Sequence, residues 1–397
     1  MPKPVPRSIV VVRQAKDAHR AARDALAALG LPSCAGQTVL LKPNAGRDAA
    51  PGSGIVTHPD VVAGVAEFFR DAGAARVLIG ESPILGVKAM DAFKAMGLDR
   101  VAKETGAQLV DLDAKKPVIV RIPGADAVRQ IKVCADVLAA DLVVSIPVVK
   151  THMHTRVSLS IKNMKGTLWR HEKVRFHQLP ENGADRGGAK MLDVGIADLA
   201  TALMPDVALI DGTVGLEGLG PSAGTPKKLG VVVASADALA ADAVAARLMG
   251  IRPSSVHHLR LAAERGLGTI DLRRVRVEPR DYGKYASHFA PPPKKLNLTF
   301  PNVVVHAGEA CSACTSTLLL FLQQYHAGLA DYALDDGKTH VAIGKQPCAL
   351  PEGTIALGNC AAIVAGHRGE PKGVWVKGCP PVSSQILAAL GLRRNRS

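Results

Sequence analysis

Four cysteines in the last third of the chain are the residues whose spacing points most directly to chemistry. Cys311 and Cys314 lie in EACSAC, Cys360 in GNCA and Cys379 in GCPP. Each segment follows an apolar run that predicts a strand, so three loops would bring four thiols to the carboxyl edge of one small sheet. Gathered thiolates repel one another unless a metal centre neutralises them. The pattern therefore predicts that these cysteines ligate a metal centre.

The kind of metal centre follows from how the cysteines are distributed. A tetrahedral zinc site suits four cysteines, but structural zinc sites usually show paired CxxC knuckles. Here one CxxC pair is joined by two lone cysteines, which favours a [4Fe-4S] cluster. The alternative without metal is that the CxxC pair packs a helix start and the other two are turn thiols. Cys34, Cys134 and Cys348 stand alone and are predicted to be buried apolar thiols.

The pattern CxxC…GNCA…GCPP resembles the proximal [4Fe-4S] site of the nickel–iron hydrogenase small subunit and the related small subunit of respiratory complex I. In those proteins a G-x-C-A turn and a GCPP turn hold the cluster on a flavodoxin-like sheet. The matching turns here are Gly358–Ala361 and Gly378–Pro381. The resemblance is confined to the end of the chain, so it implies a cluster and not hydrogenase activity.

A second stretch with chemical character is strongly basic. From Lys150 to Lys190 the chain has nine Lys or Arg and only three Asp or Glu, with four histidines added. Lysines and an amide here would converge with those of LLKPN to bind carboxylate or phosphate, and a histidine could carry protons. Solvated surface charges are the alternative. The expected catalytic groups are Lys150, His152 and His58, with His152 or His58 as proton donor; the expected substrate-binding groups are Lys42, Asn44, Lys162, Asn163, Asp211 and Glu217.

The elements that position these residues alternate between short apolar runs and alanine-rich amphipathic stretches. Strands are expected at 8–13, 38–44, 75–82, 141–150, 207–212 and 229–237. With helices such as 58–73 between them, this alternation predicts an α/β fold with a largely parallel open sheet and flanking helices. The proline triplet near Pro292 predicts a boundary between a basic α/β domain, 1–290, and a smaller flavodoxin-like α/β cluster domain, 293–397.

Several segments between residues 38 and 250 resemble family 362 of the domains of unknown function. The segments are LLKPN, VTHPDVVAGVAEFFRDAG, PVVKTHMHTRVSLSIKNMKG and IDGTVGLEGLGPSAGTPKKLG. Many relatives carry a ferredoxin-type domain with CxxCxxCxxxCP runs, which this chain lacks, so the resemblance does not imply a ferredoxin role. The family has no settled reaction. The resemblance singles out Thr57, His58, Lys150, His152, Lys162, Asn163, Asp211, Glu217 and Gly220.

Three further segments lead to minor expectations. GLEGLGPSAG, 215–224, is weak as a dinucleotide fingerprint and is expected to be a loop that places Asp211 or Glu217 beside the pocket, or a plain structural loop. RHEKVRFHQ, 170–178, could form a flexible basic lid. His257 and His258 are expected at the surface.

The amino-acid composition limits the classes of partner that this protein could bind. The net charge is +14, which fits nucleic acid, an anionic substrate or an acidic protein partner. Stacking aromatics and long basic runs are missing, which argues against nucleic acid. The chain shows no signal-peptide layout and no apolar stretch long enough for a membrane span, so a cytoplasmic protein is expected.

The leading hypothesis is a cytoplasmic iron–sulfur oxidoreductase or lyase that acts on a small anionic substrate. One alternative is a non-catalytic electron-transfer module that docks an acidic redox partner protein. The other is a zinc-stapled anion-binding protein.

Overall fold

The computed structural model describes residues 8–181, 186–293, 297–345, 349–364 and 373–393. The chain forms two compact units, Met1–Pro293 and Lys294–Ser397. This division falls beside Pro292, where the sequence places a boundary. Cys348 lies outside the described residues.

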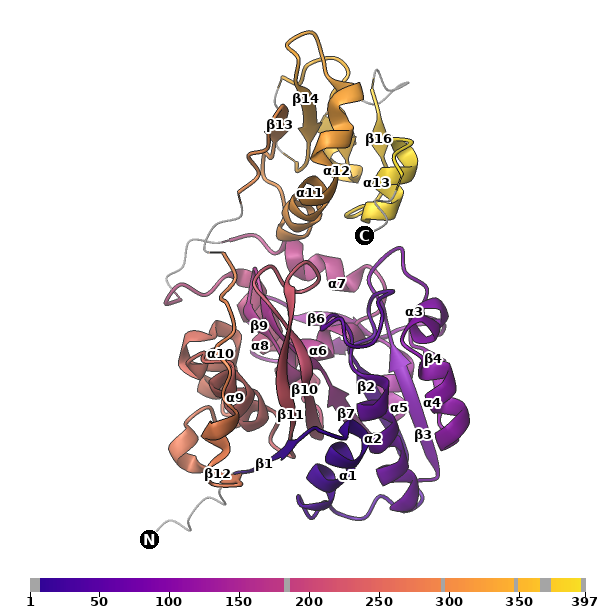
Figure 1. Cartoon of the computed structure of the whole chain (residues 1–397), viewed down its shortest axis with the longest axis vertical. Helices are drawn as coiled ribbons and strands as arrows, with labels where there is room; N and C mark the ends of the chain where they lie inside the picture. The colour runs from indigo at the N-terminus through magenta and orange to yellow at the C-terminus, as the bar shows by residue number, and fades with distance from the viewer. Residues whose placement is uncertain (1–7, 182–185, 294–296, 346–348, 365–372, 394–397) are drawn as a thin grey trace. The chain divides into compact units, whose positions relative to one another are not determined.

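The large unit is built around one sheet, with strand order β12-β1-β11-β10-β7-β2-β3-β4 (Figure 1). Its pairs from β10 through β7, β2 and β3 to β4 are parallel, and β1 and β10 pair antiparallel with β11. β8 joins β10, and β9 joins β8. The strands are β1 Ser8–Gln14, β2 Thr38–Pro43, β3 Arg76–Glu81, β4 Gln108–Asp111, β5 Val118–Arg121, β6 Gln130–Val133, β7 Leu142–Ile146, β8 Val148–His152, β9 Arg156–Ser158, β10 Val207–Glu217, β11 Thr225–Ser235 and β12 Val275–Glu278.

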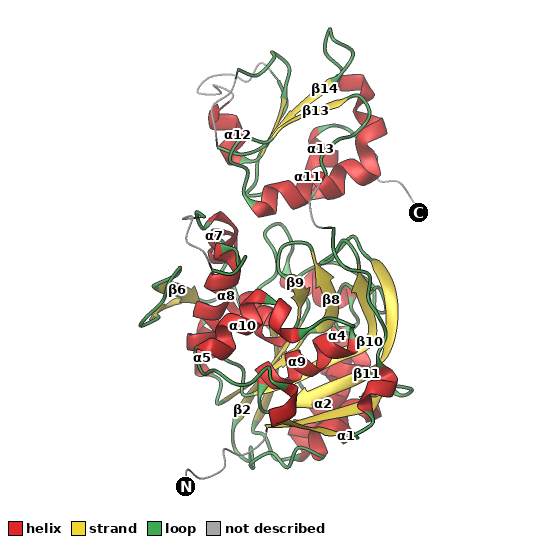
Figure 2. Ribbon diagram, turned by 90° about the vertical axis from the view of Figure 1, so that its left-hand side faces the viewer, coloured by secondary structure: helices red, strands yellow, loops and turns green. Residues whose placement is uncertain are grey.

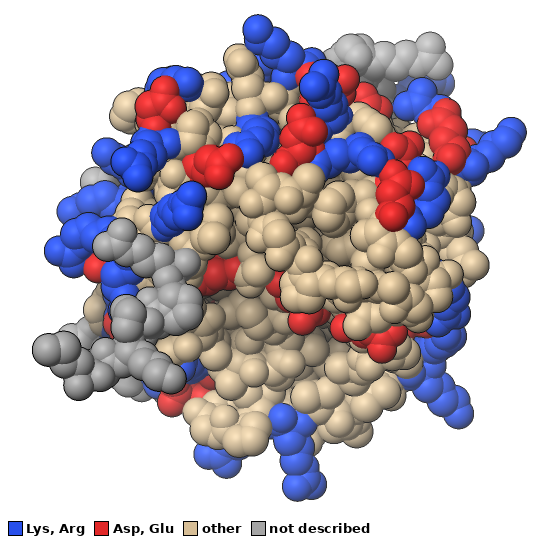
Figure 3. Space-filling view, turned by 90° about the horizontal axis from the view of Figure 1, so that it is seen from below, with Lys and Arg blue, Asp and Glu red and all other residues tan. Residues whose placement is uncertain are grey.

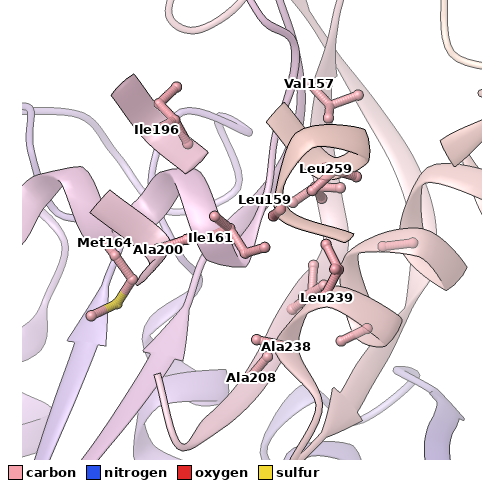
Figure 4. Packing of buried hydrophobic residues seen from close by; sticks show 14 of the residues in the cluster. Val157, Leu159, Ile161, Met164, Ile196, Ala200, Ala208, Ala238, Leu239 and Leu259 are labelled. Carbon is pink, nitrogen blue, oxygen red and sulfur yellow. The ribbon is translucent and has the colours of Figure 1, made fainter. Parts of the chain in front are cut away.

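Helices cover both faces of this sheet (Figure 2). Alternate residues of each central strand enter two separate cores, as Leu40 and Leu41 do, which explains why these strands are apolar throughout. α1 to α4 close one core; α5, α6 and α8 to α10 close the other (Figure 4). The helices are α1 Ala18–Ala27, α2 Pro59–Asp71, α3 Ala89–Ala95, α4 Leu98–Thr105, α5 Ala135–Ala139, α6 Ser160–Asn163, α7 Glu172–Arg175, α8 Met191–Ala202, α9 Ala238–Leu248 and α10 His257–Glu264. The predicted fold class is confirmed.

Three predicted strands, 141–150, 207–212 and 229–237, differ from the observed bounds by more than one residue. The run 141–150 is divided at Pro147 into β7 and β8, because proline has no N–H to donate to the ladder. The run 207–212 continues to Glu217 and pairs antiparallel with β11, so the glycine-rich segment after it closes a long hairpin. Polar residues and glycines after residue 212 interrupt the apolar run, so the sequence did not predict this hairpin.

The small unit has a parallel sheet of β13 Val303–His306, β14 Thr339–Ala342, β15 Ile355–Leu357 and β16 Trp375–Val376. Its strand order follows the chain, whereas the flavodoxin order places the second strand outside the first. α11 Ser312–Tyr325 and α13 Ser383–Ala389 pack on one face with Leu322 and Ile386, and α12 Asn359–Val364 packs on the other.

Surface charges on the large unit are mixed in sign. On α1 and α2, Arg23 pairs with Glu67 and Asp71 at 3.2 and 2.8 Å. Figure 3 shows basic and acidic side chains side by side on the face seen from below. This face offers no continuous basic surface to a polyanion.

Candidate functional site

A buried ion pair lies where β2 and β3 end. Lys42, 1% exposed, donates from Nζ to Glu81 Oε2 at 2.7 Å, to the Pro43 carbonyl at 2.7 Å and to Asn163 Oδ1 at 3.2 Å. Asn163 Nδ2 in turn donates to the Lys42 carbonyl at 2.9 Å and to Ser145 Oγ at 3.2 Å. These contacts use all three ammonium donors. Lys42 and Asn163, predicted to bind substrate, therefore hold the framework together.

Glycine at position 166 allows the chain to close over this pair. A Cβ there would lie 2.3 Å from Glu81 Oε1 and 2.6 Å from Lys42 Nζ. Burial raises the pKa of the Glu81 carboxyl, while the Lys42 ammonium and the Ala45 N–H act against that rise. The pair is thus sealed from water and fixes the segment that carries Lys162 and Lys165.

Lys150 and Asn44, predicted to converge, do so. Lys150 Nζ donates to Asn44 Oδ1 and to the Ile55 carbonyl at 2.8 Å, so one of its three donors has no partner among the described residues. Burial, followed by the charges of Lys162 and Arg47, holds the pKa of Lys150 well below its usual value. The loop between β2 and α2 is thereby tied to β8.

The cationic cluster, which we define as Arg47, Lys150, Lys162 and Lys165, is the most unusual feature of the large unit. Within the described part of the chain, none of its members forms an ion pair with a carboxylate. Lys165 is 9% exposed; its ammonium lies 5.9 Å from the centroid of the Phe176 ring and has no hydrogen-bond partner among the described residues. Burial and the charge of Lys162 lower the pKa of Lys165; burial, opposed by the charge of Asp193, lowers that of Lys162 to about 8. A buried cation without an ion-pair partner destabilises a fold unless an anion compensates it.

Histidines lie beside the cationic cluster. His152 Nδ1 accepts from the backbone N–H groups of His154 and Thr155 at 3.1 and 3.4 Å. Burial and the charge of Lys162 hold the pKa of His152 well below its usual value, so the ring is neutral with its proton on Nε2. In this state its Nε2–H can donate a hydrogen bond, and the role of His152 as a proton donor stays a prediction. His177 packs edge-on against His154, with ring centroids 6.1 Å apart.

Three other predicted residues have local partners. His58 caps α2, accepting from the Asp60 N–H at 3.3 Å. Asp211 accepts from the backbone N–H groups of His58 and Thr213 at 2.7 and 2.9 Å, so this buried carboxylate ties α2 to β10. Glu217 accepts from the Ala290 N–H at 2.7 Å and pairs with Lys227 at 2.9 Å.

The glycine-rich segment supports the strand that carries Lys150 and His152. The Met153 N–H donates to the Gly220 carbonyl at 3.0 Å, and Thr151 Oγ1 donates to Gly218 O at 3.0 Å. A Cβ at Gly220 would lie only 1.8 Å from the Thr151 carbonyl oxygen. Through these backbone contacts the segment supports β8, which agrees with the alternative that it is a plain structural loop.

The structure contradicts two predictions, the flexible basic lid at 170–178 and the surface position of His258. Residues 172–178 form α7 and a 3₁₀ turn, and Phe176 in that turn is fully buried, so the segment is packed. His258 is also fully buried, with Nδ1 3.4 Å from Asp193 Oδ1. The surface prediction for His258 is wrong because the neighbouring helix α8 packs against α10 and covers this histidine.

The four cysteines come from three loops that contact one another. Cys311 precedes α11, Cys360 lies at the start of α12 and Cys379 follows β16. The Asn359 N–H donates to Gly378 O at 2.9 Å, and the Gly378 N–H donates to Asn359 Oδ1 at 3.0 Å. These bonds join the loops of Cys360 and Cys379.

Electrostatics show that the thiols lie near one another. A hydrogen bond from Cys314 and the N–H groups at the start of α11 lower the pKa of the Cys311 thiol to about 6. The pKa of Cys314 is raised by Cys311, then by burial, with Cys379 and Cys360 adding to the rise. Among the described residues, no group of three or more His, Cys, Asp or Glu side chains is arranged to hold a metal ion. The described cysteines are all free thiols, and Cys34 and Cys134 are buried as predicted.

Sequence reasoning missed Arg47; it noted Lys165 beside Lys162, and His177 in the predicted lid, but included neither among the expected site residues. The i, i+3 spacing of Lys162 and Lys165 could have indicated that both face one site. For Arg47 and His177 no local signal exists, because the loop after β2 and the 3₁₀ turn after α7 reach the cluster only through tertiary packing.

Comparison with known proteins adds a family. The family model described as Domain of unknown function (DUF362) matches residues 39–247. Thylakoid-associated protein sll1697 of Synechocystis sp. is 29% identical over 239 residues, which are 59% of this chain and 68% of that protein.

Two solved structures are also similar to this chain at 12% identity. One is a Thermotoga maritima protein, with 59% of this chain and 58% of that chain covered and a TM-score of 0.38. The chain thus spans less than two thirds of that protein. The other is the lactate racemase apoprotein of Thermoanaerobacterium thermosaccharolyticum, with 87% and 71% covered and a TM-score of 0.39. The family model covers more than half of the 397 residues of this chain, so the chain belongs to the DUF362 family.

Proposed function

We propose that this chain is an iron–sulfur protein, an oxidoreductase or lyase, whose large unit binds a small multivalent anion such as a phosphate or a dicarboxylate. The observation that carries the proposal is the cationic cluster, whose four basic side chains form no ion pair with a carboxylate among the described residues. An anion with two or more negative charges would neutralise it. The Nε2–H of neutral His152 supplies an additional oriented donor.

The residues that would hold a [4Fe-4S] cluster are Cys311, Cys314, Cys360 and Cys379. Their loops contact one another, and a four-iron cluster spreads its ligating sulfurs more widely than a single tetrahedral ion does. Such a cluster supplies one-electron transfer when bound. The chain contributes the thiols, two glycines with positive φ beside them and the N-terminal N–H groups of α11, which stabilise negative charge.

Metal analysis tests the small unit. Protein purified without oxygen is expected to contain about four irons and about four sulfides per chain, with a broad visible band that bleaches on reduction. Cys379→Ser and Cys360→Ser should lower the iron content, whereas Cys34→Ser, a buried thiol of the large unit, should not. One zinc with no colour would reject the cluster and leave the anion site as the remaining functional proposal.

The anion site is expected to bind more weakly as pH rises through about 8. Lys162 has a pKa of about 8 in the ligand-free chain, so it is charged below that pH and loses its charge above it. Binding an anion favours the charged form, so binding near pH 8 takes up protons. Sulfate is the suitable probe because its own charge is constant over this range. Calorimetric titration from pH 6.5 to 9 measures the affinity, in steps of about half a pH unit.

Lys162→Met is expected to remove the decline centred near pH 8, and Lys94→Met, an exposed lysine on α3, to leave it unchanged. An affinity that is independent of pH in the parent chain would contradict the assignment of Lys162 to the site.

A further inference from the structure

The hairpin of β5 and β6 stands apart from the sheet of the large unit. Its strands pair antiparallel with each other, with Ile119 opposite Lys132 and Arg121 opposite Gln130. Paired residues share a face, so these four form one face, here called the hairpin outer face. In Figure 2 the hairpin, which carries the label β6, projects at the left of the large unit.

The hairpin outer face exposes the most accessible large hydrophobic residue among those described. Ile119 is 60% exposed. The opposite face is different, because Ile131 and Val133 are buried in the core. An isoleucine on a face with no core beneath it does not contribute to folding and is free to contact another surface.

Positive charges surround Ile119. Arg121 and Lys132 share its face, and Lys116 and Arg129 flank the two strands. All four are exposed, and none forms an ion pair within the described part of the chain. Together they form a small apolar centre with a cationic surround.

We propose that the hairpin outer face docks this protein on a membrane surface that contains anionic lipid. Apolar side chains enter the boundary between headgroups and acyl chains, while the surrounding cations contact anionic headgroups. Each such cation strengthens binding about fivefold near an anionic surface. The proposal is independent of the anion site and of the cysteines.

Two other partners fit the geometry less well. Addition of a partner strand needs an open edge, but the Trp169 N–H and Arg175 already bond the carbonyls of Lys132 and Gln130. The other edge belongs to β5, which is short and follows Pro117, features that discourage strand pairing. Nucleic acid would use the cations but gains little from Ile119, and the hairpin has no aromatic residue for stacking.

Vesicle flotation of the full chain tests the proposal. Vesicles of phosphatidylcholine alone are compared with vesicles that also contain phosphatidylserine. The parent chain is expected to float with the mixed vesicles and not with phosphatidylcholine alone. Arg121→Gln with Lys132→Gln should weaken binding about 25-fold, and Ile119→Gln severalfold.

Matched controls lie elsewhere on the large unit. Lys94→Gln with Lys103→Gln removes two exposed charges, and Met90→Gln removes a side chain that is 46% exposed. Both should bind within about twofold of the parent. Equal binding to both vesicle types, no binding, or equal losses in the control variants would overturn the proposal. Loss of duplex DNA binding in the double variant, with no effect on vesicles, would assign the face to nucleic acid instead.

Discussion

Lys165→Met is expected to stabilise the ligand-free chain and to weaken anion binding about 30-fold or more. Lys165 is 9% exposed, lies beside Lys162 and lacks a described hydrogen-bond partner, so its charge opposes folding when no anion is bound. Methionine keeps most of the side-chain volume without the charge, and we expect a gain of about 1 kcal/mol in the free energy of unfolding. Removing a buried charge that contacts a ligand lowers affinity by at least about 2 kcal/mol.

The measurement combines urea unfolding with sulfate titration. The chain has two tryptophans, so Trp375→Phe leaves Trp169 as the reporter of the large unit. Lys94→Met serves as the exposed control and should change neither quantity. If Lys165→Met destabilised the chain without changing sulfate affinity, Lys165 would be a framework residue and the anion site would lose its principal argument.

Lys42→Met is expected to have the opposite effect on stability. Removing Lys42 leaves Glu81 buried without its ion-pair partner, and breaking such a pair destabilises a protein by about 3–5 kcal/mol. The Glu81 pKa, already raised by burial, would rise further, so the folded variant holds a proton that the unfolded chain releases. The variant should therefore become less stable as pH rises above the ordinary glutamate range.

Glu81→Gln in the Lys42→Met background provides the control. It removes the unpaired carboxylate, so both the stability loss and its pH dependence should shrink. A Lys42→Met loss that is small, or that grows at acid pH, would show that the ion pair does not hold the ends of β2 and β3 together.

The parallel core was predictable because both its faces are buried. Each strand, such as β2 or β7, then reads as a continuous apolar run, and helices such as α1 and α2 begin at a side-chain cap. The β10–β11 hairpin was not predictable in this way. Its outer half carries Lys227 and Glu217, which pair with each other across the hairpin, so the run loses its apolar signature there.

The site was predictable in its location and less so in its roles. Strand-end placement located Lys42, Asn44 and Lys150 at one edge. Residue type alone cannot tell a lysine that is fully engaged, such as Lys42, from one without a partner, such as Lys165. That distinction depends on whether a carboxylate from another strand reaches the ammonium, as Glu81 does.

Each unit closes its own core, and this has an evolutionary consequence. Leu322 and Ile386 complete the core of the small unit using only residues after 297, and the two large cores use only residues before 293. Gene fusion or recombination at the junction can therefore exchange the cysteine-bearing module without repacking the segment that defines the family. A lineage could exchange the small unit in this way while keeping the DUF362 segment, 39–247, unchanged.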